Sequence, residues 1–221
     1  MNPVLGKISS VFEYVRNSDG RPTGATKDVL STELQARIAA GVTFKVTAKV
    51  DGTCCWIHNS ELMARQDIKN GRTAPTGWVA TAGDEPDIGG HLIGFRPLDP
   101  KGGADKWHHQ ALLPDGKALF FERAESGFVE VEKSLKDYEG MTVELVGPKL
   151  QGNPHGVLKH GLIVHGSIDI SSTLSDGWKN HTPLKKWLTE GAGVTYEGIV
   201  LHGSDGALYK CHRGHLGLSW K

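Results

Sequence analysis

Short stretches with alternating apolar and polar residues recur along this chain. In FKVTAKV, residues 44–50, every second side chain is apolar, which is the period of a strand with one buried face. The alternation predicts a strand and places Lys49 on the same polar face as Thr47. Further short runs of strand-forming residues are bounded by residues that favour turns; these runs are CCWIH, ELMAR, ALFFE, MTVELV, GLIVHG, EGIVLH and ALYKCH.

Two segments carry the signals of helix ends. Thr32 and Gln35 have the spacing of an N-terminal capping box, and Gly41 marks the end of that helix. The second helix is expected to start at a capping Thr182, with a proline in its first turn, and to end at Gly191. Its apolar face consists of Leu184, Trp187 and Leu188.

Strands scattered along the chain, with few helices between them, predict an α+β protein with mostly antiparallel sheets. Residues 67–117 are rich in glycine, proline and aspartate, which predicts a long loop over part of that stretch. The 221 residues suffice for one large domain.

Composition narrows the class of protein. Lysine and arginine total 25, as do aspartate and glutamate, so net charge alone gives no argument for binding nucleic acid, although a local basic groove stays compatible. No signal peptide or run of 18 apolar residues is present, so no membrane association is expected. The 3 cysteines, two of them adjacent, indicate reduced thiols in an intracellular protein, in the cytoplasm or a host's cytoplasm.

Lys49 stands two residues before Asp51, which is followed by Gly52. A lysine becomes a nucleophile when a nearby cation or a low-dielectric site favours its neutral amine. Asp51 is placed to orient that amine or to hold the water shell of a metal, and Gly52 permits a tight turn. The four-residue pattern alone is weakly specific, because a solvated lysine at a strand end also fits it.

Later segments repeat the placement of charged side chains in or beside predicted strands. ELVGPKLQGNP contributes Glu144, and YEGIVLH contributes Glu197 directly before a glycine. ALYKCHR contributes Lys210, with His212 and Arg213 after it. The order and wide spacing of these residues are far more specific than any one of them.

This constellation resembles the covalent nucleotidyltransferase superfamily of polynucleotide ligases and mRNA capping enzymes. Lys49 to Gly52 match its Lys-x-Asp-Gly motif, and Arg65 matches the arginine of the following motif. Glu144 matches the third motif's carboxylate, for which Glu122 in FFERAE is a rival. The remaining matches are Glu197-Gly198 and Lys210, the first lysine of the last motif.

The closer resemblance is to the small animal-type RNA ligases, which join 5′-phosphate and 3′-hydroxyl RNA ends. KVDGTCC, ELVGPKLQGNPHG, EGIVLHGSDGALYK and HRGHLGLSW carry it, as blocks scattered over residues 40–221. It implies a nucleotidyltransferase (ATP-grasp-like) fold in which helices flank the sheets and the nucleotide lies in the cleft between them. It also implies a single adenylyltransferase domain over residues 1–221, with no C-terminal OB-fold domain, and no obligate protein partner.

The resemblance further implies ATP as substrate and Mg²⁺ or Mn²⁺ as cofactor. Lys49 would form a lysyl-AMP intermediate, supported by Asp51 and Lys210. The carboxylates of Glu197 and Asp51 would hold the metal. The nucleotide would contact Lys49, Arg65, Glu144, Glu197, Lys210 and His212.

Several alternatives stay open. The superfamily's last motif is Lys-x-Lys, whereas this chain has Lys210-Cys211-His212, so His212 or Arg213 would have to take the second lysine's place. A non-catalytic module that binds RNA ends fits the same motifs, as does, less well, a GTP-using capping enzyme. CHRGH, residues 211–215, is a weak zinc pattern. KGGADKWHH, residues 101–109, fits either a basic loop that contacts RNA or a solvated loop.

Overall fold

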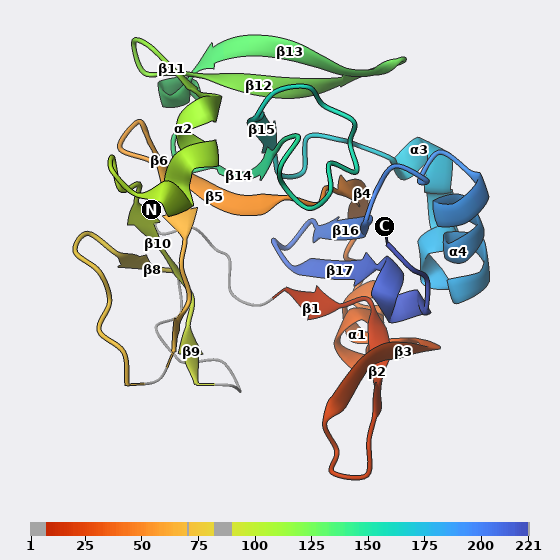
Figure 1. Ribbon diagram of the computed structural model, residues 1–221. Helices are drawn as coiled ribbons and strands as arrows, with labels where there is room; N and C mark the ends of the chain where they lie inside the picture. Colours follow the sequence, from red (N-terminus) through yellow and green to blue (C-terminus); the bar gives the residue numbers. More distant parts are fainter. Residues whose placement is uncertain (1–7, 70, 82–89, 221) are drawn as a thin grey trace. The chain divides into compact units, whose positions relative to one another are not determined.

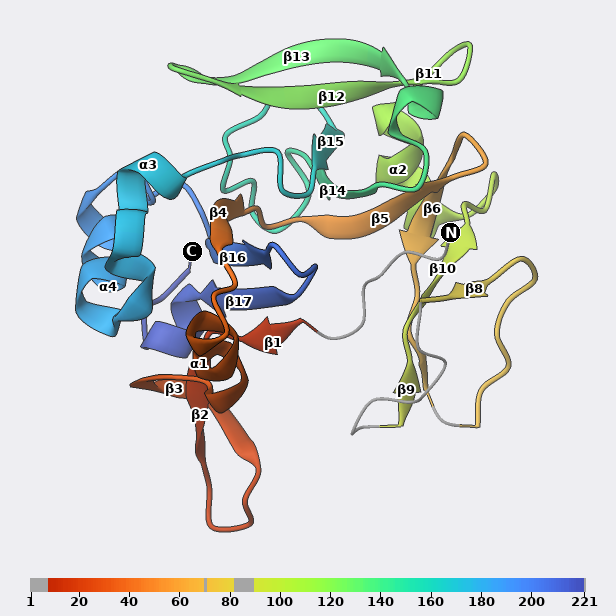
Figure 2. The same ribbon diagram turned by 180° about the vertical axis from the view of Figure 1, so that it is seen from behind.

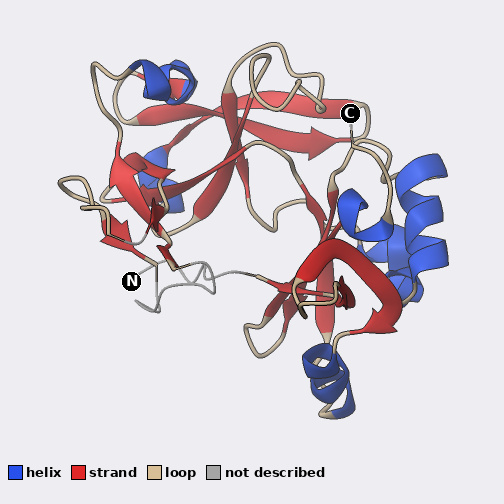
Figure 3. Ribbon diagram, turned by 60° about the horizontal axis from the view of Figure 1, so that its bottom comes forward, coloured by secondary structure: helices blue, strands red, loops and turns tan. Residues whose placement is uncertain are grey.

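The computed structural model describes residues 8–69, 71–81 and 90–220, and the chain divides into two compact units (Figure 1). One unit is Asp51–His165; the other joins residues 8–50 to residues 166–220. Strands outnumber helices along the described chain (Figure 3). The predicted α+β class with largely antiparallel sheets is therefore confirmed.

The Asp51–His165 unit is built on a nine-stranded sheet in the order β11-β12-β15-β14-β5-β6-β10-β8, with β13 on β12. All its pairings are antiparallel except β12 with β15. Figure 2 shows β13 lying along β12. Its strands are β5 (Thr53–His58), β6 (Glu61–Arg65), β8 (Val79–Ala80), β10 (Gly94–Pro97), β11 (Leu112–Leu113), β12 (Lys117–Ala124), β13 (Gly127–Ser134), β14 (Thr142–Val146) and β15 (Gly161–Val164). The unit also contains the β7 (Ile68–Lys69) and β9 (His91–Leu92) pair, η1 (Gly103–Asp105), α2 (Lys106–Ala111) and η2 (Leu135–Tyr138).

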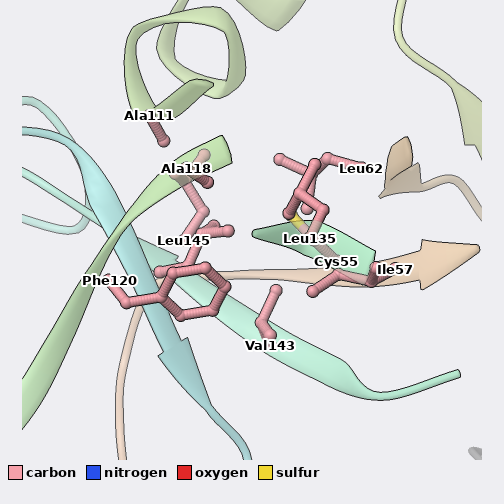
Figure 4. Packing of buried hydrophobic residues seen from close by; sticks show 10 residues of the cluster. Cys55, Ile57, Leu62, Ala111, Ala118, Phe120, Leu135, Val143 and Leu145 are labelled. Carbon is pink, nitrogen blue, oxygen red and sulfur yellow. The ribbon is translucent and has the colours of Figure 1, made fainter. Parts of the chain in front are cut away.

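A cluster of buried side chains holds this sheet together (Figure 4). Cys55, Val143 and Phe120 come from three of its strands, and Ala111 comes from α2. Each of these side chains is at most 1% exposed. Burial of a large apolar side chain stabilises the folded state by roughly 1.5–3 kcal/mol. A slip of one residue would turn the buried side chains of β14 away from the cluster, so the cluster fixes the register of β14 between β5 and β15.

The other unit is built on a four-stranded sheet in the order β1-β17-β16-β4. Its strands are β1 (Ser9–Ser10), β4 (Phe44–Lys49), β16 (Gly198–Gly203) and β17 (Leu208–His212). The unit also contains the hairpin of β2 (Phe12–Arg16) and β3 (Pro22–Leu30), the helices α1 (Thr32–Ala39), α3 (Ser171–Leu174) and α4 (His181–Glu190), and the 3-10 turns η3 (Ser175–Lys179) and η4 (Arg213–Leu216).

The predicted alternation of β4 holds on one face of this sheet. Val46 and Ala48 are buried, and they lie opposite the buried Leu201 and Ile199 of β16. The other face departs from the simple pattern because Thr47 is only 1% exposed. Its hydroxyl lies 2.9 Å from Nε2 of His202 on β16, so a hydrogen bond compensates for burying the polar group.

Both predicted helices form, but neither begins as predicted. Thr32 is the first residue of α1 rather than its cap, and its hydroxyl donates to Glu13 from β2. Helix α4 begins one residue before Thr182, where the His181 amide donates to Asp28 from β3 at 2.6 Å. Side chains from strands distant in the sequence thus accept hydrogen bonds at the starts of both helices, where local capping residues were expected to accept them. The apolar face of α4 is buried as predicted, and Gly191 follows its last residue.

Residues 67–117, over part of which a long loop was expected, also contain five short strands, η1 and α2. Asp105 organises part of this stretch: its buried carboxylate accepts two hydrogen bonds from Arg96 and one from the amide of Asp99. Burial acts to raise the pKa of Asp105, but these hydrogen bonds outweigh it and the pKa lies below its usual value. Residues 82–89 of this stretch lie outside the described residues.

No helix in the described part of the chain is long and apolar enough to span a membrane.

Candidate functional site

Lys49 and Glu197 form an ion pair in the unit built on the four-stranded sheet. Lys49 is the last residue of β4 and Glu197 directly precedes β16, whose first residue, Gly198, lies opposite Lys49. The backbone adds a bond from the Glu197 amide to the Lys49 carbonyl at 3.1 Å. The two side chains are 25% and 18% exposed, so the pair is shielded but still reachable from solvent.

Gly198 lies between Lys49 on one neighbouring strand and His212 on the other. A Cβ atom at Gly198 would lie 2.0 Å from the carbonyl oxygen of Cys211, so β16 and β17 could not pair this closely with any other residue there. The glycine also leaves the position between Lys49 and His212 without a side chain. Lys210 lies on the same face of β17 as His212, because residues two apart share a face.

His212 and His215 face each other, with ring centroids 3.5 Å apart, because η4 folds back directly after β17. Burial and the nearby positive charges of Lys49 and Lys210 lower the pKa of His212 to about 4. Burial, His212 and the same two lysines lower the pKa of His215 to about 3. Both imidazoles are therefore neutral at pH 7, and the charge near Lys49 comes from lysine.

Arg213 does not take the place of a second motif lysine. Its side chain is buried and donates to the carbonyl groups of Leu188, Gly193, Val194 and Tyr196. Burial lowers the pKa of Arg213, but a guanidinium remains charged at neutral pH. The residue fastens the segment after α4 to the last strand, so the suggestion that it neutralises phosphate is wrong for this structure.

The weak zinc pattern in residues 211–215 also fails on geometry. Cys211 is fully buried on the face of β17 opposite to His212. Burial raises the pKa of the Cys211 thiol, which disfavours the thiolate that zinc requires. All three cysteines are free, as the sequence indicated.

Glu144 lies in the middle of β14, in the Asp51–His165 unit. Its carboxylate lies 2.7 Å from Nε2 of His165, whose Nδ1 is 2.9 Å from the Thr142 hydroxyl. The Glu144 side chain is 12% exposed. Glu144 thus presents a partly buried carboxylate on the sheet, and its contact with His165 holds that carboxylate in position.

Cys54 lies opposite Glu144 on the neighbouring strand β5. Burial and the negative charge of Glu144 raise the pKa of the Cys54 thiol to about 12, and Arg65 opposes this shift. Arg65, the last residue of β6, is also held by Asp67 through bonds of 2.9 and 3.1 Å. Cys54, Glu144 and His165 have ligand atoms within 4.8 Å of one another, which is the one such group found among the described residues.

Glu122, the rival of Glu144, lies on β12 with half of its side chain exposed and forms an ion pair with Lys133. A surface pair of this kind is a common structural feature with little energetic value. Of the two carboxylates, Glu144 is the more buried, and its contact with His165 fixes its position.

Asp51 and Gly52 adjoin the segment that follows β14. Nε2 of His155 lies 3.1 Å from the Asp51 amide and 3.2 Å from its carbonyl oxygen. A Cβ atom at Gly52 would lie 2.2 Å from the Leu145 carbonyl oxygen. Close contact with β14 therefore requires a glycine here.

The predicted site residues fall into two sets, each within its own unit. Lys49, Lys210 and His212 lie in the four-stranded sheet and Glu197 directly precedes its strand β16, while Arg65, Glu144 and Asp51 belong to the Asp51–His165 unit. The sequence did not single out His165 or His155, because only strand pairing and loop folding bring them to Glu144 and Asp51. His215 was visible only as part of the weak zinc pattern.

Comparison with known proteins gives consistent matches. A model of the family described as RNA ligase 1 matches residues 72–221. The RNA ligase 1 of Pongo abelii is 30% identical, over 89% of this chain and 73% of its own length. That of Danio rerio is 30% identical over 100% of this chain and 83% of its own length, and that of Mus musculus is 28% identical over 89% of this chain.

Proposed function

This chain belongs to the RNA ligase 1 family, and we propose that it joins RNA 5′-phosphate and 3′-hydroxyl ends with ATP, through an AMP group carried on Lys49. Membership of the family confirms the resemblance to animal-type RNA ligases and supports RNA as the substrate. The observation that carries the proposed mechanism is the placement of Lys49 beside Glu197, with Lys210 and His212 on the same sheet face.

In the proposed first step, Nζ of Lys49 attacks the α-phosphorus of ATP, a P–N bond forms and pyrophosphate leaves. A lysine amine attacks only without its proton, so the ammonium held by Glu197 must release that proton first. Lys210 is the residue placed to neutralise the α-phosphate.

His212 acts in this scheme as a neutral hydrogen-bonding group. A neutral imidazole has one N–H donor, which suits a phosphate oxygen without adding charge. Contact with His215 fixes the plane of its ring. Where the Lys-x-Lys motif has a second, positively charged lysine, this chain thus has the neutral imidazole of His212 in a fixed orientation.

Glu144 and Arg65 are proposed to contact the ribose and phosphate of the nucleotide. A carboxylate fixed by His165 accepts hydrogen bonds from ribose hydroxyls. Arg65 keeps its guanidinium oriented through Asp67.

The residues fit a hard divalent cation bound largely through water. Glu197 offers a partly exposed carboxylate, and Asp51 is the second proposed ligand, while the metal-capable group found among the described residues includes neither. Mg²⁺ keeps several waters and needs few protein oxygens. Bound to Glu197, Mg²⁺ or Mn²⁺ would neutralise phosphate charge and compete with the ammonium of Lys49 for the carboxylate.

In the two proposed later steps, AMP passes from Lys49 to the RNA 5′-phosphate, and the 3′-hydroxyl then displaces AMP. Each step breaks one bond to phosphorus and forms another. Such reactions depend on positioning and charge neutralisation more than on covalent assistance from the protein.

Intact-mass measurement after incubation with ATP and Mg²⁺ tests the proposal. We expect the mass of one AMP on the wild-type chain and none on Lys49→Ala. Lys45→Ala is the matched control, since Lys45 lies on the same strand and its side chain is 49% exposed. An adduct that persists in Lys49→Ala would place the nucleophile elsewhere.

The same assay separates the rival functions. A GMP adduct formed from GTP would indicate a capping enzyme. A folded chain that binds 5′-phosphorylated RNA but forms no adduct under any metal condition would be a non-catalytic RNA-end-binding module.

A further inference from the structure

The Asp51–His165 unit contains a second candidate ligand site, which none of the residues assigned above lines. A cavity of about 430 Å³ lies between α2 and the segment that connects β14 to β15. Trp107 and Gln110 of α2 line one side; Pro148, Lys149 and Leu158 belong to the connecting segment. This volume is within the range of sites that hold small ligands or single nucleotides, about 300–1,000 Å³.

The connecting segment is held in shape by its own hydrogen bonds. Asn153 exchanges two side-chain bonds with the backbone of Val157, at 2.9 and 3.1 Å. The amide of Leu150 donates to the Gly147 carbonyl at 3.1 Å. A Cβ atom at Gly147 would lie 2.1 Å from the His160 ring, so the glycine lets the segment lie against that ring. The cavity wall is therefore formed before any ligand arrives.

The cavity combines an apolar wall with positive charge. The Trp107 ring stacks on His160, with centroids 4.6 Å apart. Leu158 also lines the cavity and is 87% exposed, so it offers apolar surface to a ligand. The lining includes two lysines and no acidic residue among those the structure describes.

The two lysines remain accessible to an anion. Lys149 is exposed at the start of the connecting segment. Lys159 is 65% exposed and contacts Glu130 at 2.7 Å. A surface ion pair of this type is weak, so a phosphate can displace the carboxylate. Lys106, 4.6 Å from the centroid of the Trp107 ring, adds positive charge beside the cavity.

We propose that this cavity binds one nucleotide of a single-stranded segment of the RNA substrate. The base would lie against Leu158 and Pro148, and the adjoining phosphates would contact Lys149 and Lys159. Single-stranded RNA is bound elsewhere by this combination of apolar or aromatic surface for bases and a basic rim for the backbone. Gln110, exposed one turn after Trp107 on α2, supplies an amide to the base edge.

The inference rests on the proposed function, because it assumes that the substrate is RNA. It assigns a role to Lys106 and Trp107, which belong to residues 101–109 and lie in α2 rather than in a loop.

The test measures binding of a labelled, 5′-phosphorylated single-stranded RNA by fluorescence anisotropy at several salt concentrations. We expect the double variant Lys149→Glu and Lys159→Glu to weaken binding at least about tenfold and to reduce the salt dependence. Leu158→Ser should weaken binding about threefold or more without changing the salt slope, because it removes only apolar contact. Lys117→Glu and Lys136→Glu together are the charge-matched control; both lysines are exposed in the same unit and neither lines the cavity.

Two results would overturn the assignment. One is an equal loss of affinity in the double variant and in the charge-matched control at Lys117 and Lys136, which would indicate unspecific attraction by surface charge. The other is unchanged RNA binding in the double variant. If free AMP displaced the RNA from the wild-type chain, at concentrations that leave the RNA bound to Lys149→Glu/Lys159→Glu, the cavity would be a site for a free nucleotide instead.

Formation of the AMP adduct without RNA provides an independent readout. We expect the adduct in the double variant at wild-type level, because none of these residues belongs to the set around Lys49. If the wild-type chain formed no adduct, the proposed function would be rejected. The comparison of RNA binding among the variants would still show whether the cavity binds RNA.

Discussion

Lys49 and Glu197 are 148 positions apart in the chain, yet they form an ion pair between the end of β4 and the start of β16. The adjacent register, Lys49 opposite Gly198, holds both residues at the same end of the sheet. The proposed nucleophile and the carboxylate beside it are thus held together by backbone pairing.

Replacing Glu197 with glutamine should reduce the rate of AMP-adduct formation by at least about a hundredfold. The amide keeps the shape of the side chain but loses the charge that holds the ammonium and binds a cation. The rate of mass increase with ATP and Mg²⁺ measures the effect. Glu190→Gln, at the exposed end of α4, should react at the wild-type rate. Equal rates in both variants would remove Glu197 from the mechanism.

Replacing Glu144 with glutamine should raise the ATP concentration needed for half-maximal adduct formation about tenfold, since one charge-assisted hydrogen bond is lost. Titration of ATP in the adduct assay measures this concentration. Glu122→Gln serves as the comparison, because its exposed carboxylate on β12 is the rival for the same role. The assignment is reversed should Glu122→Gln show the larger increase.

Replacing Gly198 with alanine should lower the free energy of unfolding by about 1–3 kcal/mol. The new Cβ would meet the Cys211 carbonyl oxygen at 2.0 Å and force β16 away from β17. Urea denaturation measures the change. Gly103→Ala is the control, since no atom lies within 4 Å of its added Cβ and its φ is not positive. A Gly198→Ala variant as stable as Gly103→Ala would contradict the close strand contact.

Stability should fall as the pH is lowered from 7 to 4. The unfolded chain takes up protons on histidine from about pH 6.5 downward, whereas the folded chain keeps His212 neutral to about pH 4 and His215 to about pH 3. Since the unfolded state binds more protons in this window, its free energy falls relative to the folded state. Each histidine contributes at most about 1.4 kcal/mol per pH unit.

Urea denaturation at several pH values measures this slope. Burial also lowers the pKa of His108, His160 and His181, so the wild-type slope is a sum over several imidazoles. The His215→Gln variant isolates one contribution and should show a shallower slope than the wild type below pH 6.5. Identical slopes would show that His215 is not held neutral.

The sequence by itself determined several of the strands, the α+β class and the candidate chemistry. The alternation in residues 44–50 correctly gave β4 its buried face, because a strand's side chains alternate whatever lies around it. The spaced motifs likewise identified Lys49, Glu197 and Lys210, since their order along the chain is itself the signal. The apolar face of α4 followed from its helical period.

Only the tertiary structure decided which side chains meet. Asp28 and Glu13 satisfy the starts of α4 and α1 from distant strands, which no local capping pattern reveals. Arg213 and His212 are adjacent in sequence, yet one is buried among carbonyl groups and the other lies beside Lys49 and Lys210, because alternation and the turn of η4 send them in different directions. Local patterns record the period of the backbone, whereas partners and pKa values depend on strand register and burial, which arise only when distant segments pack.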